Sequence, residues 1–201
     1  MNLINIGSFA LLCIFGISYI SKLIILAYKN NIKANVFGKG IKLKETLVVE
    51  KCLKVITFIE IGIWTVDALF PAFAEKWFIK IYESFGISFF GLTITLIGIS
   101  LFILAMMVMK TSWRAGIDKS TKTTLVTSGI YRYSRNPAFV GMDLMFIGIA
   151  IIHGNLITMV LSILVIISLH LQILQEENHM KEVFQKKYNE YANKTPRYLL
   201  F

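Results

Sequence analysis

Cysteine and histidine are scarce in this chain of 201 residues, which contains two cysteines and three histidines. Cys13 and Cys52 each lie inside an apolar stretch, so they indicate packing residues and neither a disulfide framework nor a Cys-based metal site. His153, His170 and His179 lack the H-x-x-x-H spacing of a metal-binding helix, which favours structural roles. The sequence therefore predicts no metal site.

Two nucleotide-binding motifs are also absent, because the chain contains neither G-x-G-x-x-G nor G-x-x-x-x-G-K-[ST]. Their absence argues against a Rossmann cofactor site and against a P-loop. Acidic residues number 12 against 21 lysines and arginines, which gives a net charge of +9. The basic residues lie between apolar blocks and not along one face, a pattern typical of membrane-protein loops that argues against a nucleic-acid partner.

Long apolar blocks dominate what is present, since 56% of the residues are hydrophobic. The blocks are too long for the core of one soluble domain, and a membrane-crossing helix needs about 20 mostly apolar residues. The sequence predicts an all-α, polytopic integral membrane protein with about five transmembrane helices in a single domain. The first block lacks a preceding basic region and an A-x-A site, so we expect a retained span and not a signal peptide. The predicted spans cover residues 3–28, 46–70, 85–109, 138–152 and 156–174.

The loops between these blocks alternate in charge. The first loop is basic, the second balances two acids with two lysines, the third is basic again, the fourth has no lysine or arginine, and the tail is basic. By the positive-inside rule, we expect a non-cytoplasmic N-terminus and a cytoplasmic C-terminus.

Acidic residues inside the second span are candidates for buried contacts. Glu50 and Lys54 stand four residues apart and can pair. Glu60 and Asp67 share one face that should look into the bundle, where a structural role and a substrate role are both open. Asp143 in the fourth span is a further candidate, either functional or bonded to a neighbouring helix.

The last two spans are joined by a short polar turn, His153-Gly154-Asn155, which predicts a C-terminal helical hairpin. Beyond it, apolar residues recur at helical spacing with lysines elsewhere on the wheel. This pattern predicts an amphipathic tail helix at the cytoplasmic interface.

The hairpin should bring two polar segments together. Asn136-Pro137 suits a helix start, whose free N–H groups can bind an anionic cofactor group. Glu176 and Glu177 lie just after the last span, where carboxylates can accept hydrogen bonds from an amino group or ribose hydroxyls. Spacing alone favours a purely structural reading, in which Asn136-Pro137 is a helix cap and the two glutamates suit a first helical turn.

The same two segments resemble a known family. Leu125-Val126, Gly129, Tyr131, Arg135-Asn136-Pro137, Phe139 and Gly141 resemble the L-V-x-x-G-x-Y-x-x-x-R-H-P-x-Y-x-G signature of the isoprenylcysteine carboxyl methyltransferases. Glu176-Glu177, Met180, Phe184, Tyr188 and Tyr191 resemble that family's E-E-x-x-L-x-x-x-F-x-x-x-Y-x-x-Y tail. The resemblance covers about the last ninety residues, which divides the chain into N-terminal spans, 1–110, and a cofactor-binding catalytic region, 111–201.

The resemblance implies S-adenosylmethionine as methyl donor, bound at the cytoplasmic side, and a lipid-modified acceptor that enters from the bilayer. It identifies no catalytic residue, and Asp118 is a weaker candidate for the cofactor site. The cofactor contacts that it implies are Thr123, Thr124, Leu125, Val126, Tyr131, Asn136, Pro137, Ala138, Phe139 and Glu176.

Three positions depart from the family pattern. Asn136 replaces a histidine and Phe139 a tyrosine, although Asn can still hydrogen-bond and the related phospholipid N-methyltransferases tolerate R-N-P. Gln172 stands where the prenylcysteine enzymes have an arginine thought to bind the substrate carboxylate. A neutral amide cannot make that bidentate charged contact, which weakens the case for a prenylcysteine acceptor.

The leading hypothesis is therefore an S-adenosylmethionine-dependent methyltransferase of the isoprenylcysteine type, with Gln172 at the substrate. Methylation of a phospholipid amine or another membrane lipid is the enzymatic alternative. An amine acceptor must lose a proton, which Glu60, Asp67 or Asp143 could take if one of them reaches the pocket. A non-catalytic membrane protein that keeps the fold is the alternative from another class. A sterol-type reductase is disfavoured, because those chains are far longer and use a nicotinamide cofactor.

Overall fold

The computed structural model describes residues 2–119 and 123–199, and these form helices joined by loops, with two isolated β-bridges and no strand. The all-α prediction is confirmed for these residues. Short 3₁₀ turns, η1 and η2, lie in the connection between α4 and α5. The elements are α1 (Leu3–Asn30), α2 (Lys44–Leu69), α3 (Pro71–Trp77), α4 (Phe85–Met109), η1 (Lys110–Ser112), η2 (Gly129–Arg132), α5 (Pro137–His153) and α6 (Leu156–Lys194).

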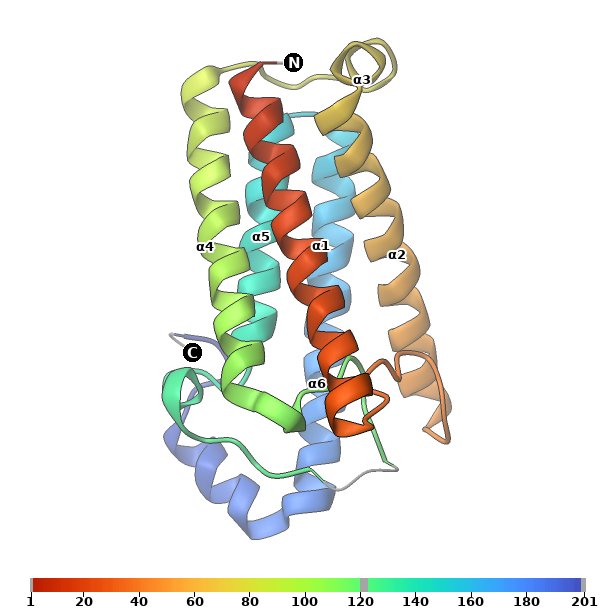
Figure 1. The fold of residues 1–201 in the computed structure, drawn as a ribbon, viewed down its shortest axis with the longest axis vertical. Helices are drawn as coiled ribbons and strands as arrows, with labels where there is room; N and C mark the ends of the chain where they lie inside the picture. Colours follow the sequence, from red (N-terminus) through yellow and green to blue (C-terminus); the bar gives the residue numbers. More distant parts are fainter. Residues whose placement is uncertain (1, 120–122, 200–201) are drawn as a thin grey trace.

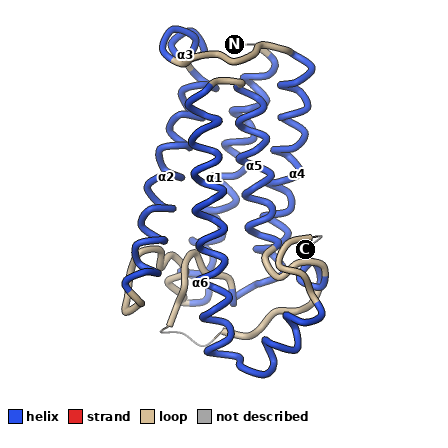
Figure 2. Tube along the Cα trace, turned by 180° about the vertical axis from the view of Figure 1, so that it is seen from behind, coloured by secondary structure: helices blue, strands red, loops and turns tan. Residues whose placement is uncertain are grey.

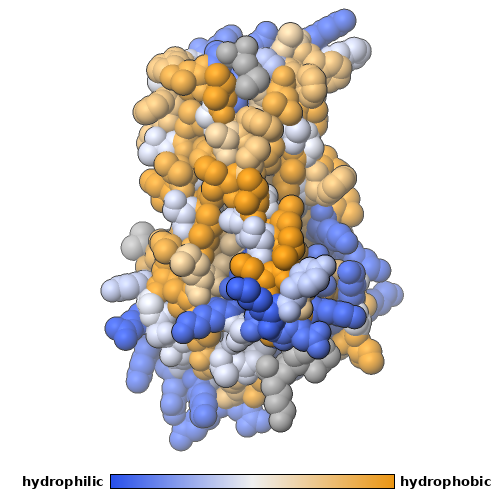
Figure 3. All heavy atoms as spheres, in the orientation of Figure 1, coloured by the Kyte–Doolittle hydropathy of each residue, from blue (hydrophilic) through white to orange (hydrophobic). Residues whose placement is uncertain are grey.

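Five of these helices, α1, α2, α4, α5 and α6, run along the long axis of the molecule as one bundle (Figure 1). Figure 2 shows the bundle from behind, with loops gathered at its two ends. Large apolar side chains point outward along the bundle, including Ile17, Phe58 and Phe90 with exposed fractions of 66%, 78% and 60%. Figure 3 shows apolar residues over the middle of this face and hydrophilic residues at the end that carries the C-terminus. This distribution is expected for helices whose solvent is lipid.

The helices differ in their suitability as membrane spans. By length and composition, α1, α4 and α6 are each apolar enough to cross a membrane, and α2 passes the same test together with α3 across a 115° bend. Pro71 opens α3 at this bend, and its missing N–H interrupts the hydrogen bonds of a continuing helix. Helix α3 was not predicted from the sequence. Helix α5 is apolar but has 17 residues, so the predicted total of five spans stays a prediction.

The acidic residues of α2 have partners on two different sides. Glu60 accepts a hydrogen bond from Ser162 at 2.8 Å, and Asp67 accepts from Thr158 at 3.0 Å, both across the contact with α6. The predicted inward face of these two acids is confirmed, and their contacts are structural. The predicted pairing of Glu50 with Lys54 is wrong, because Lys42 of the preceding loop is the ion-pair partner of Glu50, at 2.6 Å.

Helices α4 and α5 touch along a seam of glycines. A Cβ atom added at Gly98 would lie 2.5 Å from the backbone nitrogen of Met145 and 2.6 Å from the carbonyl oxygen of Gly141. Two backbones approach this closely only where no side chain separates them. The seam fixes α5 against α4 and so positions Asn136 and Pro137 at the start of α5.

Helix α6 extends further than its predicted span. Gly154 and Asn155 separate it from the end of α5, and Gly154 has a left-handed conformation, with φ 58°. The helix then continues to Lys194 with a break in its dihedral angles at Gln185, φ 45°, where the chain changes direction (Figure 1). The predicted interfacial tail helix therefore corresponds to the end of α6, and its position relative to a membrane stays a prediction.

Candidate functional site

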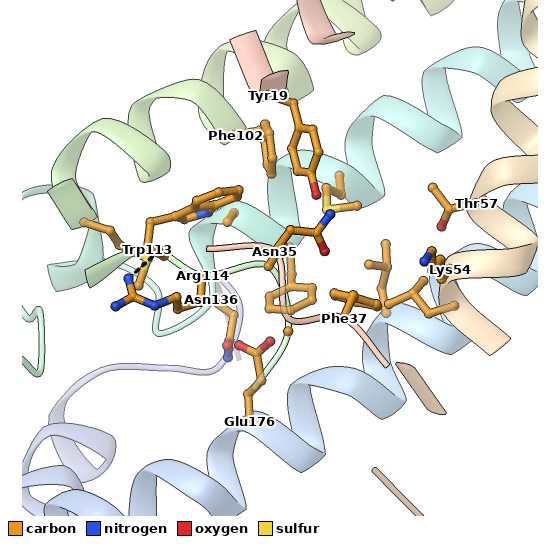
Figure 4. A pocket seen from close by; sticks show the side chains of 18 of the residues that line it. Tyr19, Asn35, Phe37, Lys54, Thr57, Phe102, Trp113, Arg114, Asn136 and Glu176 are labelled. Carbon is orange, nitrogen blue, oxygen red and sulfur yellow. Dashed lines mark hydrogen bonds between the residues drawn. The ribbon is translucent and has the colours of Figure 1, made fainter. Parts of the chain in front are cut away.

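A cavity of about 880 Å³ lies at the hydrophilic end of the bundle. Its walls come from α1, α2, α4, α5 and α6 and from the loops before α2 and before α5 (Figure 4). Most of the residues that the sequence assigned to cofactor binding line this cavity. They are Thr124, Leu125, Val126, Tyr131, Asn136, Ala138, Phe139 and Glu176.

Three assigned residues lie elsewhere. Thr123 lines a neighbouring, more open cavity of about 800 Å³, which shares Thr124, Leu125 and Tyr191 with the first. Pro137 is buried as the first residue of α5. Gln172 is fully buried and does not line the cavity; its Nε2 donates to Glu176 Oε1 at 3.1 Å.

The two polar sequence motifs meet at one end of the bundle. Asn136 occupies the cap position of α5 but makes no side-chain capping bond. Its Nδ2 instead donates to Glu177 Oε1 and to the carbonyl oxygen of Arg197, both at 3.3 Å. The start of α5, the middle of α6 and the C-terminal segment are therefore held together by Asn136.

Glu176 and Glu177 have different partners. Glu177 is buried and accepts hydrogen bonds at 2.9 Å from the guanidinium groups of both Arg135 and Arg197. Arg135 also donates to the carbonyl oxygens of Ala192 and Thr195, at 2.8 Å each. A carboxylate with two guanidinium partners has little capacity left for a ligand. Glu176, one residue earlier, lines the cavity and is the carboxylate available there.

Tyr131 also lines this cavity. Its carbonyl oxygen accepts a hydrogen bond from the hydroxyl of Tyr191 at 2.6 Å. Burial raises the pKa of the Tyr131 hydroxyl well above its usual range, with smaller contributions from the charges of Glu176 and Tyr191. The hydroxyl therefore stays protonated at neutral pH and can donate a hydrogen bond into the site.

Glu50 holds the loops that form the opposite wall. Its carboxylate accepts hydrogen bonds from the backbone nitrogens of Gly38 and Ile117, at 2.6 and 2.8 Å, in addition to the ion pair with Lys42. The adjoining strand-like contact between Asn35 and Ala115 joins the same two loops. Removing one partner from such a buried pair is typically strongly destabilising. Glu50 therefore stabilises the wall that contains Phe37 and Gly116.

Several cavity residues were not identified from the sequence. Tyr19, Phe37 and Trp113 line the cavity, and the Tyr19 and Trp113 rings pack edge-to-face with centroids 5.7 Å apart. Single aromatic residues inside or beside apolar blocks have no spacing that separates a site from a core. Asp118, the weaker candidate, forms an ion pair with Arg114 at 3.2 Å and does not line the cavity.

The lining suits an organic cofactor with both polar and aromatic parts. Glu176 offers a carboxylate acceptor, Asn136 an amide, and Trp113 and Phe139 apolar ring surfaces. Among residues 2–119 and 123–199, no group of three or more His, Cys, Asp or Glu side chains is arranged to hold a metal ion. The cavity is thus suited to hydrogen bonding, charge compensation and packing.

Two comparisons with known proteins bear on this site. The sequence model of the phospholipid methyltransferase family matches residues 87–187, which include most of α4, all of α5 and most of α6. The protein-S-isoprenylcysteine O-methyltransferase of Schizosaccharomyces pombe (strain 972 / ATCC 24843) is 36% identical over 73 residues. That match covers 36% of this chain and 31% of the yeast protein, so the chain spans about a third of the length of this relative.

Proposed function

Because this chain belongs to the phospholipid methyltransferase family, we propose that it is an enzyme that transfers a methyl group from S-adenosylmethionine to a lipid-embedded acceptor. The observation that carries the proposal is the cavity that joins both family-like motifs to an apolar interior. It supports a site where a water-soluble donor and an insoluble acceptor meet.

The residues around Glu176 fit the methyl donor. We assign the Glu176 carboxylate to the donor's hydroxyl or amino groups, because Glu177 is already occupied by two arginines. Tyr131 and the segment of Thr124, Leu125 and Val126 form the adjoining wall. Thr123 would then contact the donor from the more open cavity, and Pro137 would act only by setting the start of α5.

When bound, S-adenosylmethionine supplies an electrophilic methyl group, which an acceptor lone pair takes while the electrons of the broken carbon–sulfur bond stay on sulfur. The protein's own part is alignment and exclusion of water, which can supply a large share of the rate. Phe37, Trp113 and Phe139 line the cavity and contribute apolar surface to it, which favours exclusion of water. Glu176 can also offset the positive charge of the bound donor.

The apolar side of the cavity supports an acceptor with a long hydrocarbon part. Phe15, Phe58, Ile61 and Phe102 line it and come from three different helices. A carboxylate acceptor needs no base, whereas an amine must lose a proton. Glu60, Asp67 and Asp143 do not line the cavity, which favours an apolar thioether acid over a phospholipid amine.

The basic end of the bundle supports a cytoplasmic location for this site. The loop before α2 and the connection after α4 carry the excess of lysine and arginine that the positive-inside rule associates with the cytoplasm. We infer that the C-terminus and the cavity face the cytoplasm and that the N-terminus does not.

The direct test is methyl transfer by the purified full chain in lipid nanodiscs. The protein is incubated with methyl-labelled S-adenosylmethionine and, in separate reactions, a farnesyl thioether carboxylic acid and phosphatidylethanolamine. Label in the acid is the expected result, and label only in phosphatidylethanolamine would support the lipid-amine alternative. A protein that binds no S-adenosylmethionine by calorimetry would contradict the proposal and favour a non-catalytic role.

Replacing Glu176 tests the assigned carboxylate. We expect Glu176→Gln to raise the dissociation constant for S-adenosylmethionine about tenfold, as for loss of a charged hydrogen bond. Calorimetry on the variant and on wild type measures the change. Glu45→Gln is the matched control, because Glu45 is exposed at the start of α2 and does not line the cavity. Equal affinity in wild type and Glu176→Gln would remove Glu176 from the site.

A further inference from the structure

One wall of the cavity carries hydrogen-bond donors that the cofactor assignment does not use. Lys51 and Lys54 of α2, Asn35 of the preceding loop and Tyr19 of α1 all line it. Figure 4 shows Tyr19, Asn35 and Lys54 on elements across the cavity from Asn136 and Glu176. The family motifs do not include these residues, because they belong to the first two helices and the loop between them.

The two lysines lie near the start of α2, at the hydrophilic end of the bundle, and their exposed side chains also line the cavity. They stand three residues apart on α2 and so share a face, beside the apolar Val55 and Phe58 that also line the cavity. In the described part of the chain, neither lysine forms an ion pair, since the nearby Glu50 is bound by Lys42. A lysine that lines a mostly apolar cavity and has no ion-pair partner is a candidate for binding an anionic group.

Asn35 and Tyr19 add neutral donors to the same wall. The Asn35 backbone is fixed by its bridge to Ala115, and the Tyr19 ring packs against Trp113. Neither side chain forms a hydrogen bond to another of the residues that the structure describes. In Figure 4 the Tyr19 hydroxyl and the Asn35 amide point toward one another within the cavity.

We propose that Lys51, Lys54, Asn35 and Tyr19 bind an anionic group, a carboxylate or a phosphate, that the acceptor carries at the end of its apolar chain. This inference rests on the proposed function and specifies its acceptor. The hydrocarbon part then lies along Phe58, Ile61 and Phe102, and the exposed Phe58 side chain places one edge of this path at the outer surface of the bundle. Ammonium, amide and hydroxyl donors complement anionic oxygen atoms, whereas a cationic acceptor would be repelled by both lysines.

The position of Gln172 makes a separate anion site necessary for such an acceptor. Gln172 is fully buried and bonded to Glu176, so it offers the cavity no donor. The lysines supply positive charge from the opposite wall. The acceptor and the donor would then be held from different sides, with Glu176 on the donor's side and Lys54 on the acceptor's.

The test removes the negative charge from the ligand and, separately, the positive charges from the protein, and measures ligand binding in each case. Binding of a farnesyl thioether carboxylic acid and of its neutral primary amide is measured for the full chain in neutral nanodiscs, with S-adenosylhomocysteine present. Wild type should bind the acid about tenfold more tightly than the amide, and the double variant Lys51→Met, Lys54→Met should bind both alike. Affinity for S-adenosylhomocysteine should be unchanged in the double variant.

Lys44→Met is the matched control, because Lys44 lies at the start of the same helix, is exposed and does not line the cavity. This control should keep the preference for the acid. The inference is wrong if the double variant still binds the acid more tightly than the amide. It is also wrong if wild type binds acid and amide equally and shows no preference for a ligand with a phosphate. In either case the lysines only extend toward the membrane surface.

The phosphate arm uses lysophosphatidylethanolamine and a long-chain amine without phosphate. Loss of a phosphate preference in the double variant identifies phosphate as the anion, whereas loss of the acid preference identifies carboxylate. A wild-type protein that methylates neither ligand but binds the acid through Lys51 and Lys54 would contradict the proposed function and leave this site in place. If the double variant methylates the acceptor as fast as wild type does, the proposed function stands and the anion site at Lys51 and Lys54 is contradicted.

Discussion

Gln172 stands one helical turn before Glu176 on α6, and its amide nitrogen donates to the Glu176 carboxylate. The sequence placed Gln172 at the acceptor by analogy with an arginine. In the structure it contacts the proposed donor-binding carboxylate and is shielded from the cavity. We therefore infer that Gln172 acts on the proposed site through Glu176.

Replacing this amide by a guanidinium tests the two roles. We expect Gln172→Arg to pair with Glu176 and to weaken S-adenosylmethionine binding about tenfold, since a bidentate ion pair would occupy the carboxylate. Calorimetry of donor binding and turnover of a carboxylate acceptor are measured together. If turnover rises while donor affinity is unchanged, position 172 faces the acceptor as the family resemblance implies. Gln172→Leu separates the effect of charge from that of the lost hydrogen bond.

At the scale of whole helices, the contact between α4 and α5 decides where the start of α5 lies. We expect Gly98→Ala to lower the free energy of unfolding by about 3 kcal/mol, because the new Cβ would overlap backbone atoms that cannot move aside. Thermal melting of the purified protein in detergent measures the change.

Gly62→Ala is the control for this substitution. Gly62 lies in the interior of α2, and a Cβ added there would have no atom within 4 Å. Alanine there should be neutral or stabilise by up to about 1 kcal/mol, because glycine is the poorer helix former. A Gly98→Ala protein that melts with wild type would show that the two helices can separate at little cost.

The helices themselves were largely predictable from apolar block length, and the inward face of Glu60 and Asp67 from their spacing. The partner of Glu50 was not, because four-residue spacing pointed to Lys54 while the chain before α2 folds back to bring Lys42 closer. The close contact of α4 and α5 at their glycines could not be predicted either, because Gly98 is one small residue in an apolar run.

The candidate site likewise has one part that could be predicted from the sequence and one part that could not. Its α5 and α6 walls follow from two motifs that resemble a known family. Its α1 and α2 walls, with Tyr19 and Lys54, depend on how distant helices pack, which no local pattern records. The break at Gln185 was also missed, because nothing in the residue type indicates a positive φ.

For the molecule as a whole, the distribution of charge between the two ends predicts its orientation. Single cysteines are introduced at Lys39 and, in a second protein, at Glu75, with Cys13 and Cys52 replaced by alanine. Both positions are exposed and lie at opposite ends of α2. In intact cells we expect a membrane-impermeant thiol reagent to label position 75 and to leave position 39 unlabelled.

Permeabilised cells provide the control, in which both positions should react. Labelling of position 39 in intact cells would place the basic loops and the cavity outside the cytoplasm. It would thereby contradict the inferred location of the donor site without affecting the fold.

The hydrogen bonds of the acids in α2 have a consequence for how the chain enters a membrane during translation. Glu60 is bonded to Ser162, 102 positions later, and Asp67 to Asn155 and Thr158, 88 and 91 positions later. When α2 emerges from the ribosome, the groups that will satisfy its carboxyls have not been synthesised. Insertion of α2 into the bilayer before α6 is made is then disfavoured by about 2.5–3.5 kcal/mol for an acidic residue near the middle of the helix. We therefore expect α2 to remain near the translocation machinery until α6 has been synthesised and the two helices can enter the bilayer together.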